Sequence, residues 1–98
     1  MSLNNKQIRF LRALAHSMKP VVLIGGAGLT DNVINEINHA LDDHELIKIR
    51  VNADDREAKA EMISSIANQT EASHVQTIGH IGIFYRANKK APKMQLPK

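Results

Sequence analysis

The sequence predicts a single α/β domain in which three helices pack on a mixed four-stranded sheet, in the order α-β-α-β-α-β-β. Three segments repeat apolar residues at helical spacing, and the remaining segments are short apolar or alternating runs typical of strands. Alternation of strand, helix and strand implies right-handed crossovers and a partly parallel sheet, to which a C-terminal hairpin adds an antiparallel part. The length of 98 residues suits one such domain.

The first helix is expected over residues 4–19, between a capping box of Asn4 with Gln7 and a stop at Pro20. Its apolar stripe, with Phe10 at the edge, consists of Ile8, Leu11, Leu14, Ala15 and Met18. Basic side chains fall together on the other side of this helix: Lys6, Arg9, Arg12, His16 and Lys19. Like charges at this spacing repel one another, and a ligand of negative charge would offset that repulsion.

The middle of the chain predicts two strands around a second helix. Residues 21–24 are wholly apolar, which is typical of a strand covered on both faces. Thr30 is a suitable N-cap for a helix over residues 31–44. Residues 46–51 alternate and place Leu46, Lys48 and Arg50 on one side, so this strand has one wetter face.

The C-terminal part predicts a third helix, a hairpin and a tail. Asp54 with Glu57 caps a helix that runs to about Gln69. Residues 74–86 suggest two strands joined by a tight turn near residues 79–82. Residues 87–98 contain four lysines and two prolines with little to bury. We therefore expect one domain over residues 1–86 and a flexible basic tail over 87–98.

Composition and charge exclude several classes of protein. The absence of cysteine excludes disulfides and cysteine-based metal sites, and no apolar run approaches the roughly 20 residues that span a bilayer. We expect a cytoplasmic monomer without a membrane partner. Residues 1–30 carry four basic and no acidic residues, residues 31–71 carry ten acidic and four basic ones, and residues 72–98 carry five basic ones. If the two basic ends meet, they form a positive face that attracts phosphate.

A glycine-rich loop over residues 25–28 follows the first apolar run. A dinucleotide fingerprint that starts at Gly26 would have Asp31 as its third position, where a carboxylate repels pyrophosphate. A P-loop needs a lysine after the glycines, and none follows. The spacing G-x-x-G, formed by Gly25, Gly26, Ala27 and Gly28, is instead the pattern with which KH domains clamp single-stranded RNA. A plain turn needs one or two glycines, so the surplus indicates a flexible loop or a close approach by another backbone.

Other titratable residues do not predict catalysis or metal binding. The five histidines lack the spacing of metal motifs, and His39 and His44 point about 140° apart on their helix. Asp42, Asp43 and Glu45 are explained by solvation at a helix end. We expect no enzyme activity, no cofactor and no metal.

Four stretches of the chain resemble the YhbY/CRM-domain family of RNA-binding proteins over roughly residues 3–86. These are KQIRFLRALAH (6–16), KPVVLIGGAGLTDNVINEI (19–37), ALDDHELIKIRV (40–51) and IGHIGIFYR (78–86). The resemblance implies a fold similar to the C-terminal domain of translation initiation factor three. It also implies a single-domain bacterial member that associates with the precursor of the large ribosomal subunit. The RNA-binding loop of the family maps onto residues 25–28, but its common lysine after the first glycine is Gly26 here.

We therefore expect a non-catalytic module that binds ribosomal RNA by shape, with ribosomal proteins as further partners. Besides the loop, the expected contacts are Lys6, Arg9, Arg12, His16, Lys19, Arg86, Lys89 and Lys90. The cations from both ends of the chain are expected to converge around the glycine loop. The alternative is a protein-interaction module that uses the acidic segment 31–71 without direct RNA contact.

Overall fold

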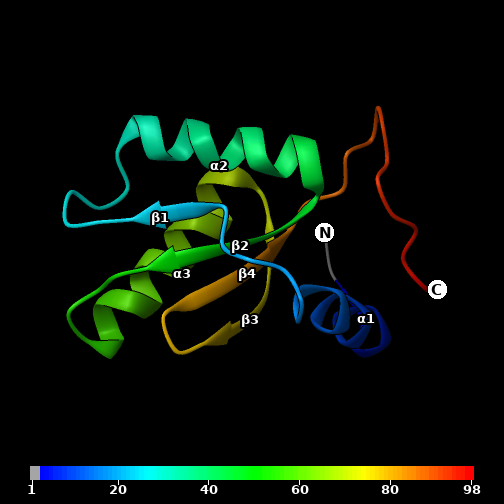
Figure 1. Ribbon diagram of the computed structural model, residues 1–98, viewed down its shortest axis with the longest axis horizontal. Helices are drawn as coiled ribbons and strands as arrows, with labels where there is room; N and C mark the ends of the chain where they lie inside the picture. The colour runs from blue at the N-terminus through cyan, green and yellow to red at the C-terminus, as the bar shows by residue number, and fades with distance from the viewer. Residues whose placement is uncertain (1–2) are drawn as a thin grey trace.

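The computed structural model describes residues 3–98 and contains the predicted elements in the predicted order (Figure 1). They are α1 (Asn5–Ala15), β1 (Val22–Ile24), α2 (Asp31–His44), β2 (Leu46–Val51), α3 (Arg56–Thr70), β3 (Ser73–Ile78) and β4 (Ile81–Tyr85). The four strands form one sheet in the order β1-β2-β4-β3. β1 is parallel to β2, and the other two pairs are antiparallel. The predicted mixed sheet is therefore confirmed.

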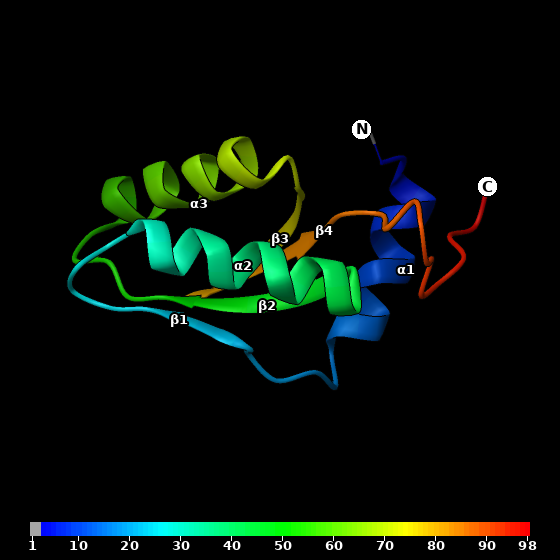
Figure 2. The same ribbon diagram turned by 90° about the horizontal axis from the view of Figure 1, so that it is seen from above.

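The helices divide unequally between the two faces of the sheet. α2 and α3 lie along one face and bury the larger core, to which β2 contributes Ile47, Ile49 and Val51 (Figure 2). α1 lies at one end of the molecule and forms a smaller core with Leu46 and Tyr85 on the opposite face. Because α1 is only eleven residues long, it leaves the rest of that face uncovered, and we call the uncovered part the open face.

Local capping signals set most helix starts. The capping box of Asn4 and Gln7 and the Thr30 cap are both present, as predicted. The third helix begins one residue later than expected, because Asp55 and not Asp54 accepts the hydrogen bond from the backbone N–H of Ala58. The first helix ends at Ala15, four residues before its predicted end, and Leu14 is 40% exposed in place of being buried.

The prediction that the first strand is covered on both faces is wrong. β1 is an edge strand, and only Val22 and Ile24 point into the core under α2 and α3. Leu23 and Val21 face the other way and are 58% and 45% exposed. The physical reason is the position of α1, which covers the far end of that face and does not reach β1 with its apolar stripe.

The expectation that residues 87–98 have little to bury is also wrong. Ala87, Met94 and Leu96 pack against the smaller core, and the side-chain amide of Gln7 donates to the carbonyl oxygen of Pro97 at 3.0 Å. The tail is thus anchored beside α1, at the end of the molecule where both basic segments meet (Figure 2). No helix within residues 3–98 is long and apolar enough to cross a membrane.

Candidate nucleic-acid interface

An open groove runs between α1 and the open face. One wall is the basic side of α1, where helical spacing brings Arg9, Arg12 and His16 together. The floor comes from three strands and consists of Lys48, Gln76, Ile78 and Ile83. None of the side chains that line this groove is acidic. Within residues 3–98, neither Arg9 nor Arg12 forms an ion pair, so their charge remains available to a ligand.

The side chains of the open face lie in two rows across the strands. The row beside α1 joins Lys48 of β2 to Ile83 of β4, which is buried under α1, and through it to Gln76 of β3. The outer row, one pleat repeat further from α1, consists of Leu23, Arg50, Ile81 and Ile78, one residue from each strand. In both rows the cation comes from β2, one of the two inner strands. Sequence reasoning placed Lys48 and Arg50 on a wetter face but did not recognise them as candidate contacts.

The basic surface extends from the groove toward β1 at the edge of the sheet. The ammonium group of Lys48 is fixed at the head of the groove by a 3.0 Å hydrogen bond to the carbonyl oxygen of Met18. A second hollow on the β1 side is lined by Lys19, Val21, Leu23 and Arg50. Lys19 therefore lies close to the open face, as does the basic side of α1.

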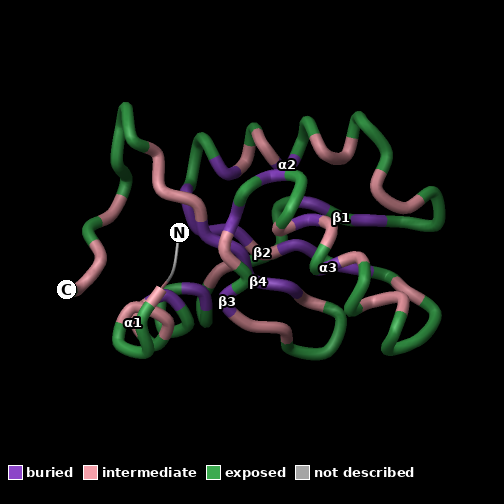
Figure 3. The backbone as a smooth tube through the Cα atoms, turned by 180° about the vertical axis from the view of Figure 1, so that it is seen from behind, coloured by how far each residue is buried: buried purple, intermediate pink, exposed green. Residues whose placement is uncertain are grey.

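The glycine loop is exposed at the end of β1 that points away from α1 (Figures 1 and 3). The backbone N–H of Gly28 donates to the carbonyl oxygen of Gly25 at 3.0 Å, and Gly28 has a φ of 75°, a conformation that favours glycine. Gly25 and Gly26 have no such conformation, and a Cβ atom added to either would meet nothing within 4 Å. Neither backbone conformation nor packing within the fold therefore requires a glycine at position 25 or 26.

The predicted convergence of both basic ends around this loop is wrong. α1 and the tail do meet, but at the opposite end of the longest molecular axis, which measures 38 Å (Figure 1). The open face lies between the two, and its outer row is immediately next to the loop, because Leu23 precedes Gly25 by two residues. Lys48 and Arg50 therefore lie between the basic side of α1 and the glycine loop, which the fold places at opposite ends of the molecule.

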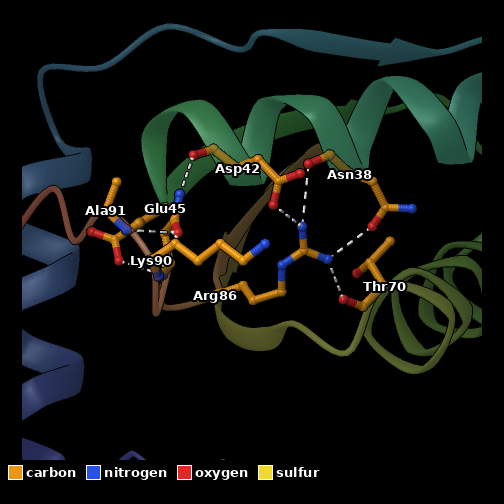
Figure 4. A network of polar contacts seen from close by, with 8 residues as sticks. Asn38, Asp42, Glu45, Thr70, Arg86, Lys90 and Ala91 are labelled. Atoms are coloured by element: carbon orange, nitrogen blue, oxygen red, sulfur yellow. Dashed lines mark hydrogen bonds and ion pairs between the residues drawn. The ribbon is translucent and has the colours of Figure 1, made fainter.

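Arg86 has a different role from the one expected of it. Its guanidinium donates to the Asn38 side chain at 2.8 Å, to the carbonyl oxygen of Thr70 at 2.7 Å and to Asp42 at 2.9 Å (Figure 4). A fourth bond of 3.2 Å reaches the carbonyl oxygen of Asn38. Arg86 therefore ties α2 to α3 and has few donors left for a phosphate.

Glu45 is buried, which contradicts the expectation that it is solvated. It is 1% exposed and connects α2 to β2 with a φ of 63°. Its carboxylate accepts backbone N–H bonds from Asn88, Lys93 and Met94 at 2.5, 2.6 and 3.0 Å. We call the hydrogen-bonded groups around Arg86 and Glu45 the junction network. Nothing in the local sequence distinguishes Glu45 from its solvated neighbours.

The remaining predicted contacts lie off the open face. Lys6 is exposed on α1 one turn before Arg9. Lys89 lines a separate hollow at the C-terminal end of α3, together with Glu71 and Tyr85. Lys90 is exposed at the start of the tail, where its backbone N–H donates to the Asn88 side chain.

Within the part of the chain that the structure describes, two titratable groups have shifted pKa values, and burial is the main cause of both shifts. Burial lowers the pKa of His74, whose ring lies 5.5 Å from that of Phe84 and 2.6 Å from the Thr77 hydroxyl. Burial and, secondarily, the charge of Glu45 raise the pKa of Tyr85. Within residues 3–98 no three histidine, aspartate or glutamate side chains form a group able to hold a metal ion.

Comparison with known proteins finds the same architecture and related sequences. A family model described as the CRS1/YhbY (CRM) domain matches residues 3–86. An RNA-binding protein of Haemophilus influenzae is 50% identical over 97 residues, which cover 99% of this chain and 97% of the relative. The probable RNA-binding protein YqeI of Bacillus subtilis is 36% identical over 95 residues, covering 97% and 99%. The solution structure of hypothetical protein SAV1595 from Staphylococcus aureus matches with a TM-score of 0.83 and 35% identity, covering 98% and 100% of the two chains. The names of the Haemophilus influenzae and Bacillus subtilis relatives refer to RNA binding and not to a reaction.

Proposed function

The chain belongs to the CRS1/YhbY (CRM) domain family, and from this premise we propose that it binds ribosomal RNA along the open face, from α1 to the glycine loop. This RNA is the ribosomal RNA of the large-subunit precursor, as the family resemblance implies. The protein acts there as a non-catalytic assembly factor, and ribosomal proteins are further partners.

The observation that supports this proposal is a series of basic side chains along two hollows whose linings contain no acidic residue. Adjoining hollows on one side of the sheet are lined by Arg9 and Arg12 on α1, His16 directly after it, Lys48 and Arg50 on β2, and Lys19 beside β1. Six of the ten acidic residues lie on α2 and α3, the helices of the other side: Asp31, Glu36, Asp42, Asp43, Glu57 and Glu61. A phosphate backbone is therefore attracted to one face and repelled from the other.

The glycine loop supports the same assignment at the far end of the open face. Gly25 and Gly26 have no conformational or packing reason within the fold, so their missing side chains leave room for an approaching sugar–phosphate backbone. The family's loop lysine is absent at Gly26. Arg50, paired in register with Leu23 next to the loop, supplies a cation close to it.

The test is a charge reversal on α1, Arg9→Glu with Arg12→Glu, measured by RNA binding across a range of salt concentrations. About six phosphate contacts give the wild type a slope of log affinity against log salt of about −4 to −5. We expect the double variant to bind ribosomal RNA fragments at least tenfold more weakly, with a slope reduced by about 2. Lys89→Glu with Lys90→Glu makes the same change of charge off the open face, and we expect a smaller loss from it.

The result also separates RNA binding from the protein-interaction alternative. In cells, crosslinking followed by sequencing should recover large-subunit precursor RNA with the wild type and lose it with the double variant. Association with ribosomal particles that survives the reversal of Arg9 and Arg12, together with salt-independent binding, would overturn the proposal. It would favour a protein contact through the exposed acidic side chains of α2 and α3.

A further inference from the structure

We propose that the outer row of the open face holds an unpaired segment of RNA, with a phosphate on Arg50 and bases against the flanking aliphatic side chains. This inference rests on the proposed function and adds the class of RNA that the face takes.

The geometry of the outer row is the first argument. Leu23 is paired in register with Arg50, Arg50 with Ile81, and Ile81 with Ile78, so the row crosses all four strands. Three strand spacings of about 4.8 Å make it about 14 Å wide. The single cation is thus enclosed by apolar side chains within one continuous strip of surface.

Exposure of these side chains is the second argument. Leu23 and Ile78 are 58% and 57% exposed, and they stand at the two edges of the sheet. Neither side chain belongs to an apolar core, although Ile78 also lines the groove beside α1. An apolar surface that the chain itself leaves uncovered is typical of a binding site.

The combination of aliphatic side chains and arginine favours unpaired RNA over a duplex. A duplex presents phosphates and ribose hydroxyl groups to a flat surface, and these polar groups would lose water against Leu23 and Ile78 without gaining a hydrogen bond. An unpaired strand exposes the apolar faces of its bases, which pack on side chains and on arginine planes. Tyr85 and Phe84 are buried, so aliphatic residues supply this contact in place of the usual aromatic ones.

Charge argues against a second copy of the chain as the occupant. Two open faces in contact would bring Arg50, Lys48 and the basic side of α1 of one copy against those of the other. Like charges at such an interface oppose association, whereas an RNA strand neutralises them.

The decisive variant removes the apolar contact and keeps every charge: Leu23→Ser with Ile78→Ser. Binding is measured by fluorescence anisotropy to an unpaired oligonucleotide of about 12 nucleotides and to the same strand annealed to its complement. We expect five- to tenfold weaker binding of the unpaired strand, affinity for the duplex within twofold of wild type, and an unchanged salt slope. Leu14→Ser is the matched control, because Leu14 is exposed on α1 outside both rows. Circular dichroism of each variant verifies that it is folded.

The outcomes distinguish this inference from the proposed function. If the wild type binds both RNAs equally and the double variant matches it, the inference is overturned while RNA binding stands. If the wild type binds ribosomal RNA fragments but neither oligonucleotide, the inference is overturned while the proposed function stands. If it binds none of these RNAs, the proposed function falls and this inference with it. If poly-glutamate binds as tightly as the unpaired strand and loses affinity in the same variant, the face is a site for acidic protein segments and the inference is overturned.

Discussion

The junction network and the open face use charged side chains in opposite ways. Arg86 and Glu45 meet partners from distant parts of the chain, with separations of 43 to 49 residues to the partners in α2 and the tail. Arg9 and Arg12 line a groove without a neighbouring acid. Charges in the first region stabilise the fold, and charges in the second are left for a ligand. The difference shows that the partners of an arginine, and not its proximity to other basic residues in the sequence, indicate its role.

The largest effect is expected from Glu45→Ala, which removes the acceptor of three tail N–H groups. Hydrogen bonds to a charged group contribute about 1.5–3 kcal/mol each, and release of the tail into water recovers part of the loss. We expect the free energy of unfolding in urea to fall by about 3 kcal/mol. Exposed Glu61→Ala is the control and should change it by less than about 0.5 kcal/mol. An equally small effect at Glu45 would show that the tail adds no stability.

The next largest effects are expected from Arg86→Ala and Arg50→Ala, whose stability and RNA affinity we compare. Loss of the Arg86 bonds to α2 and α3 should lower the free energy of unfolding by about 2 kcal/mol and leave RNA affinity nearly unchanged, apart from any loss of folded protein. Arg50→Ala should do the reverse, with stability within about 0.5 kcal/mol of wild type and severalfold weaker RNA binding. Urea denaturation and anisotropy on the same samples measure both. If the two variants changed stability and RNA affinity in the same way, the junction network and the open face would not differ in their roles.

Alanine substitutions in the glycine loop should separate structural from functional glycines. Gly28→Ala forces a side chain into positive φ and should cost about 1–2 kcal/mol. Gly25→Ala and Gly26→Ala meet no atom, so their free energy of unfolding should stay equal to wild type or rise by up to about 1 kcal/mol. Under the proposed function these two variants bind RNA more weakly although they are no less stable. Unchanged affinity in both would remove the loop from the binding surface.

The smallest effect is a pH dependence that reports on the junction network. The pKa of Tyr85 is raised, so the native state holds the phenol proton more tightly than the unfolded chain does. Its contribution to stability is complete below the ordinary pKa of 10.0 and declines as the pH rises through the higher native pKa. Tyr85 is the single tyrosine and there is no tryptophan, so ultraviolet absorbance follows this group alone. Glu45→Gln should lower its pKa, and an unchanged titration would contradict the assigned contribution of Glu45.

The sequence by itself determined what depends on neighbouring residues. Apolar periodicity predicted each helix and strand, and Asn4 and Thr30 predicted where two helices begin, because these signals act over three or four residues. It also identified the basic side of α1 and the surplus glycines. Only the tertiary structure decided that α1 covers one end of the sheet, which leaves Leu23 and Arg50 on an open face. The partners of Arg86 and Glu45 were likewise decided by contacts between residues far apart in the chain, which no local pattern encodes.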